Sequence, residues 1–131
     1  MTMLDQHTAR RIADNLAIDA DSAAGYFDLE LHLVRQRLFS ERTFGPGARV
    51  DGVCDHITKE LIEVKDSGGD LKEWVDVIIL AFDGALRSGA GPREIISALV
   101  AKQTKNEGRR WPDWRTAAPG KAIEHDRSSD R

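Results

Sequence analysis

Four acidic residues have the type and spacing to bind a metal ion. Glu60 and Glu63 are three residues apart, and so are Glu73 and Asp76. Residues three apart share one face of a helix, so each pair would present two carboxylates together. Asp76 has two apolar residues on each side of it. A carboxylate in such surroundings destabilises the fold unless it is neutralised, paired or bound to a metal ion.

The turn between the two pairs would bring them together. Gly68 and Gly69 are flexible turn residues, and two antiparallel helices joined there would direct four carboxylates towards one point. Oxygen ligands of this kind favour hard divalent ions, Mg²⁺ or Mn²⁺. The chain has a single cysteine, Cys54, which argues against a structural zinc site.

Each acid also has an ordinary structural explanation. Asp70 and Glu73 match a D-x-x-E form of the capping box, which for Glu73 alone favours a role at a helix N-terminus. Glu60 and Glu63 also fit a solvated helix face. Asp76 is harder to explain in this way. Spacing alone therefore leaves the metal centre and the structural explanation open.

The elements that carry these acids are expected to be helices. Sustained two-residue alternation is absent, so the sequence predicts an all-α protein. The expected helices cover residues 3–16, 22–42, 50–65, 71–88 (with Asp70 as N-cap) and 92–106, and an irregular segment follows from Gly108. The expected core-facing residues are Val53, Ile57, Leu61 and Val64 in the third helix and Ile95, Ile96, Leu99 and Val100 in the fifth.

The helix over residues 71–88 is apolar on nearly every side. About four helices cannot surround a fifth, so we expect a helix bundle completed by association with further copies, as a dimer or a tetramer. The 131 residues fit one domain over residues 1–125 with a polar tail over 126–131.

Composition excludes several classes of protein. No apolar stretch reaches the roughly 18 residues that span a bilayer, and the lone cysteine and the absence of a signal peptide favour the cytoplasm. The net charge of −3 and the short basic tail argue against a nucleic-acid partner. The phosphate loop of kinases and the glycine motif of dehydrogenases are both missing.

The acidic pairs also carry a resemblance. Glu60-Leu-Ile-Glu63 followed by Glu73-Trp-Val-Asp76 resembles the ExxE…ExxD signature of the MazG-like all-α nucleoside triphosphate pyrophosphohydrolases. Over residues 42–124 the chain is similar to the dATP/dGTP diphosphohydrolase branch, through Phe44-Gly-Pro-Gly, Lys102-Gln-Thr-Lys-Asn and Trp111-Pro. Nine residues separate Glu63 from Glu73, fewer than the broader family usually has.

This resemblance implies a function and a set of site residues. It implies that Glu60, Glu63, Glu73 and Asp76 bind Mg²⁺ or Mn²⁺, and that a purine deoxynucleoside triphosphate is hydrolysed to the monophosphate and pyrophosphate. Glu60, Glu63 and Asp76 become the catalytic residues, with Glu63 the best candidate for accepting a proton. In the bacteriophage type, which acts in the host cytoplasm, the reaction clears dATP and supplies dGMP for genomes that carry 2-aminoadenine.

The substrate-binding residues are expected beyond the acidic pairs. Lys102, Lys105, Asn106 and Arg109 have helical spacing and suit phosphate, although cations are also common near a helix C-terminus. Trp111 could stack on a purine or anchor the irregular tail. Asp83 could contact the sugar, a third metal ion or an arginine across a subunit interface.

Two other functions remain open on the sequence alone. One is a pyrimidine-specific or broad-specificity dNTP pyrophosphatase, and the other is a non-enzymatic helical protein whose apolar helix forms an oligomer core.

Overall fold

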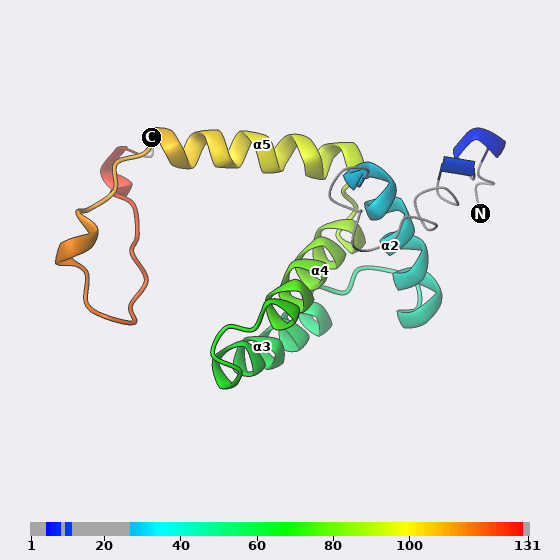
Figure 1. Ribbon diagram of the computed structural model, residues 1–131. Coiled ribbons are helices and arrows are strands. Elements are labelled where there is room, and N and C mark those ends of the chain that lie inside the picture. Colours follow the sequence, from blue (N-terminus) through cyan, green and yellow to red (C-terminus); the bar gives the residue numbers. More distant parts are fainter. Residues whose placement is uncertain (1–4, 9, 12–26, 130–131) are drawn as a thin grey trace. The chain divides into compact units, whose positions relative to one another are not determined.

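The computed structural model describes residues 5–8, 10–11 and 27–129 (Figure 1). In this part of the chain every regular element is helical, which confirms the all-α prediction. The elements are α2 (Leu29–Phe44), α3 (Val50–Asp66), α4 (Leu71–Arg87), α5 (Pro92–Gly108) and the short 3-10 helices η2 (Trp114–Thr116) and η3 (Arg127–Ser129). Most of the helix expected over residues 3–16 lies outside the described residues, as do residues 22–26 of the second expected helix.

Helix α2 begins later than predicted. The expected start at residue 22 is wrong for the part that can be checked, because Phe27 and Asp28 are not helical. Asp28 is the N-cap, and its Oδ1 accepts a hydrogen bond from the backbone N–H of Leu31 at 3.1 Å. This bond satisfies one of the amide groups that a helix start leaves without a partner, and it therefore fixes the beginning of α2.

Helices α3 and α4 form the antiparallel hairpin that the sequence predicts (Figure 1). The turn between them contains Gly68 and Gly69 with φ values of 72° and 88°, a conformation that favours glycine. At the other end of the hairpin, a Cβ added to Gly84 would lie 3.3 Å from Cγ1 of Val53. The absence of a side chain at Gly84 therefore allows the two helices to approach closely there.

The chain divides into two compact units, residues 1–96 and 97–131. In the first unit, α2 and α3 both pack against α4. Its core joins Leu33, Leu86 and Ile95, with Phe82 and Ala85 packed against them. The single domain over residues 1–125 stays a prediction.

Three of the expected core residues are exposed. Val53 and Val64 are buried as predicted, but Leu61 is 41% exposed, because among the described helices α3 packs only against α4. Leu99 and Val100 are 52% and 62% exposed, so the prediction that they point inward is wrong in the part of the chain that the structure describes. Regular spacing identifies an apolar face but not the neighbour that covers it.

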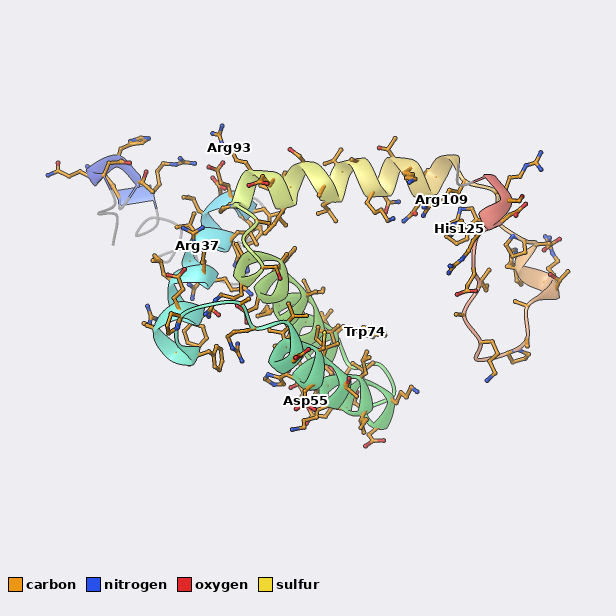
Figure 2. The ribbon with its side chains drawn as sticks, turned by 180° about the vertical axis from the view of Figure 1, so that it is seen from behind. Arg37, Asp55, Trp74, Arg93, Arg109 and His125 are labelled. Carbon is orange, nitrogen blue, oxygen red and sulfur yellow. The ribbon has the colours of Figure 1, made fainter. Side chains whose placement is uncertain are left out.

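A stripe of apolar side chains on α4 is exposed. Leu71, Trp74, Val75 and Ile78 are each at least 38% exposed, and their spacing places them on one face of the helix. Trp74, labelled in Figure 2, is 47% exposed. None of the helices in the described residues has the length and apolar character to span a bilayer.

The buried side chain of Arg87 connects the end of α4 to the loop between α2 and α3. It donates hydrogen bonds to Oγ of Ser40 at 3.0 Å, to the carbonyl oxygen of Gly47 at 2.8 Å and to the carbonyl oxygen of Gly45. Gly45 and Gly47 both have positive φ. The guanidinium group, with several donors in a fixed plane, is suited to hold such a loop.

Replacing Arg87 should therefore destabilise the fold. We expect Arg87→Ala to lower the free energy of unfolding by about 2–4 kcal/mol, because several charged hydrogen bonds are lost together. Urea denaturation followed by circular dichroism measures this change. The control is Arg93→Ala, which removes an ion pair with Glu30 from a side chain that is 86% exposed and should change stability by less than about 1 kcal/mol. Equal effects of the two substitutions would contradict the role given to Arg87.

Candidate metal centre

Three carboxylates from the hairpin converge. Glu60 on α3 and Glu73 and Asp76 on α4 each contribute a carboxylate oxygen, and these oxygens lie within 4.8 Å of one another. The turn at Gly68 and Gly69 makes this possible, because it places the end of α3 beside the beginning of α4. A group of this kind could hold a divalent cation, with the hard oxygen donors that Mg²⁺ and Mn²⁺ prefer.

The carboxylate of Glu60 is largely enclosed. Its side chain is 14% exposed, and its Oε1 lies 3.2 Å from Nε2 of His56. Its Oε2 is buried and has no hydrogen-bond partner among the described residues. Buried acceptors are normally satisfied, so this oxygen is available to a ligand.

Glu73 does not form a capping box. The backbone N–H of Asp70 donates to Oγ of Ser67 at 3.1 Å, and the side chain of Asp70 makes no cap hydrogen bond. The carboxylate of Glu73 instead lies with Glu60 and Asp76. The capping explanation that the sequence favoured for Glu73 alone is therefore wrong, because a nearby hydroxyl already occupies the amide that such a box requires.

The acids affect one another's ionisation. The pKa of Glu63 is raised, first by a hydrogen bond shared with Glu60 and then by the negative charge of that residue. The pKa of Glu73 is raised by partial burial and by the charges of Glu63 and Asp76. Glu63 is thus part of the same electrostatic group, although it is not among the three residues whose oxygens converge within 4.8 Å.

A cavity of about 210 Å³ adjoins these acids. Glu60 and Asp76 belong to its wall together with Asp83, and the rest of the lining is Gln36, Phe39, Ser40, Phe44, His56, Ile79 and Leu80. Asp83 is buried, and its Oδ2 forms an ion pair with Nη1 of Arg49 at 3.3 Å. The arginine that the sequence offered as one possible partner of Asp83 therefore lies in the same chain.

The expected phosphate-binding residues lie in the second unit. Lys102 and Lys105 are exposed on α5. Oδ1 of Asn106 accepts a hydrogen bond from Arg109 at 2.7 Å, and Nε1 of Trp111 donates to the carbonyl oxygen of Asn106 at 2.7 Å. Figure 2 shows Arg109 and His125 near the C-terminal end of α5, where the ring of His125 lies 5.5 Å from that of Trp111.

Sequence reasoning missed the contribution of α2 to this site. Gln36 is buried, and its Nε2 donates to the carbonyl oxygen of Ile79 in the middle of α4 at 2.5 Å. Its Oε1 lies 3.1 Å from Nε2 of His32. In the sequence, Gln36 is a polar residue among the apolar residues of this helix. It indicates a buried hydrogen bond only when its partner on α4 is known.

The raised pKa values predict how stability depends on pH when no divalent cation is present. The stability that a proton on Glu63 contributes is fully present below about pH 4.5, the ordinary pKa of a glutamate, and is lost as the pH rises through the raised value. We expect Glu63→Gln to raise the melting temperature at pH 8 in EDTA, with a difference that shrinks towards pH 4. Calorimetry at one protein concentration measures it.

The control for this measurement is Glu107→Gln, which neutralises an exposed glutamate on α5. A difference that is independent of pH, or equal in the two variants, would contradict repulsion within the acidic group.

Comparison with known proteins identifies the family of the chain. Curated proteins and solved structures give no match to the chain. A family model described as dATP/dGTP pyrophosphohydrolase matches residues 34–130, which include the whole α3–α4 hairpin and its acids. Because this match covers more than half of the 131 residues, the chain belongs to the dATP/dGTP pyrophosphohydrolase family of nucleoside triphosphate pyrophosphohydrolases.

Proposed function

We propose that this protein hydrolyses dATP and dGTP between the α and β phosphates with the help of Mg²⁺ or Mn²⁺ bound by its acidic group. The observation that carries the proposal is the convergence of Glu60, Glu73 and Asp76 within 4.8 Å. The products are a deoxynucleoside monophosphate and pyrophosphate. Depletion of dATP and supply of dGMP, as phage genomes with 2-aminoadenine require, is the physiological role that we propose.

The acidic residues of the hairpin have two proposed roles, metal binding and proton transfer. Glu60, Glu73 and Asp76 are the proposed metal ligands, with Glu63 as a fourth from the same electrostatic group. Such an ion, when bound, offsets the charge of the triphosphate and makes water a better nucleophile. Glu63 is the proposed proton acceptor, because its carboxylate lies beside that of Glu60, one of the proposed metal ligands.

The residues of α5 and of the segment after it are the proposed substrate contacts. Lys102, Lys105 and Arg109 carry the positive charge that phosphate oxygens require, and Asn106 is bonded to Arg109. Trp111 offers an aromatic face to a base. The family match covers all of these residues, which supports their assignment.

Product analysis tests the function directly. The protein is incubated with dATP, dGTP, dCTP or dUTP in the presence of Mn²⁺, and the products are separated by chromatography. We expect dAMP and dGMP, each with one equivalent of pyrophosphate. Exclusive use of pyrimidine substrates would contradict the purine assignment. No turnover, together with no Mn²⁺ affinity by calorimetry, would favour the non-enzymatic oligomer.

Substitution of a ligand tests the metal centre. We expect Asp76→Asn to lower kcat/KM for dGTP by at least about 100-fold, since even residues that only support a metal ligand typically contribute 10–100-fold. The variant should keep its helical circular dichroism. The matched control is Asp55→Asn on α3, an acid that is 70% exposed and pairs with Lys59. Full activity of Asp76→Asn at saturating Mn²⁺ would contradict the assignment.

We also propose that a second copy of the chain covers the exposed apolar stripe of Leu71, Trp74, Val75 and Ile78 on α4. Contiguous exposed apolar surface of this kind is typical of protein interfaces, and most soluble oligomers are formed by identical chains.

A charge within this stripe should prevent association. We expect Ile78→Glu to shift the mass measured by light scattering after size exclusion towards the 14.6 kDa monomer. The control is Val100→Glu on α5, where valine is 62% exposed and lies outside the stripe. A monomeric wild-type chain, or an unchanged mass for Ile78→Glu, would exclude the stripe as the interface.

A further inference from the structure

Asp83 has one carboxylate oxygen that the fold leaves unused. Its side chain is 6% exposed, and its Oδ2 is held by Nη1 of Arg49 at 3.3 Å. Its Oδ1 is buried and has no hydrogen-bond partner among the described residues. An ionised carboxylate can only accept hydrogen bonds, so this oxygen requires a donor from outside the described protein atoms.

Asp83 lines the cavity beside the acidic group, so a ligand in this cavity could supply the donor. Asp83 and Asp76 are seven residues apart on α4, two turns or about 10 Å along one face of the helix. Both belong to the wall of the cavity beside the acidic group. A ligand whose phosphates lie at Asp76 would therefore extend along the cavity towards Asp83.

The remaining lining of the cavity suits a nucleoside. Phe39, Phe44 and Ile79 contribute apolar surface, which is appropriate for a base. Arg49 is not available as a free cation there, because its guanidinium lies 4.3 Å from the centre of the Phe44 ring and also binds Asp83. Arg49 therefore fixes the orientation of the carboxylate and leaves Oδ1 to the ligand.

The chemistry of the two substrates selects one donor. The amino groups of adenine and guanine are on different ring carbons, so a single fixed acceptor cannot bind both in the same pose. The 3′-hydroxyl of deoxyribose is a donor that dATP and dGTP share in the same place. We infer that Oδ1 of Asp83 accepts a hydrogen bond from the 3′-hydroxyl of the substrate and makes Asp83 a specificity-determining residue. This inference rests on the proposed function.

The test compares dGTP with 2′,3′-dideoxy-GTP, which lacks this hydroxyl. For the wild-type chain we expect kcat/KM to favour dGTP by at least about 10-fold, because a site built to bind a hydroxyl rejects an analogue without it. For Asp83→Ala we expect the ratio to fall to about 1, since the variant loses the acceptor. Asp83→Asn retains an acceptor oxygen and should keep part of the preference.

The matched control is again Asp55→Asn, which should keep the wild-type ratio. Equal hydrolysis of the two nucleotides by the wild-type chain would overturn the inference. Because this comparison needs no variant, the inference can be tested even if Asp83→Ala does not fold. A wild-type preference that persists unchanged in the Asp83 variants would also overturn it. Hydrolysis of neither nucleotide would overturn the proposed function itself, which is a distinguishable result.

Discussion

The mutual approach of carboxylates across the α3–α4 hairpin is the constraint on which the site depends. Like charges this close repel one another. This repulsion adds to the hydrogen bond with Glu60 that raises the pKa of Glu63, and to the partial burial that raises the pKa of Glu73. A fold that served stability alone would separate such groups. Their convergence suits the divalent cation that we propose, which would turn the repulsion into coordination.

The rest of the first unit keeps these acids in place through polar contacts with α4. Gln36 binds the backbone of α4 at Ile79, Arg49 binds the side chain of Asp83, and Arg87 binds the loop that follows α2. Buried polar groups of this type specify one arrangement of the helices more strictly than apolar contacts do, because each needs its own partner. Helix α4 therefore carries Glu73 and Asp76 as well as the polar contacts that hold the helix in place.

The sequence predicted the hairpin well, because the signals are local. Glu60 and Asp76 were identified from spacing within their helices, and the boundaries of α3 and α4 agree with the structure to within one or two residues. The cavity could not be predicted, since Gln36 and Asp83 come together from helices far apart in the sequence. The exposure of Leu61 and Val100 was missed for a related reason, because periodicity does not say which faces acquire a neighbour.

Gly84 has a consequence for the tolerance of the hairpin to change. It lets α3 and α4 touch at Val53, while Gly68 and Gly69 set their separation at the opposite end. The acids lie between these two points, so the separation of the helices is fixed on both sides of the acidic group. A methyl group at Gly84 would lie 3.3 Å from Val53, so the two helices would have to shift by a few tenths of an ångström to accommodate it. The separation of the two helices that carry the proposed metal ligands therefore depends partly on a residue that has no side chain.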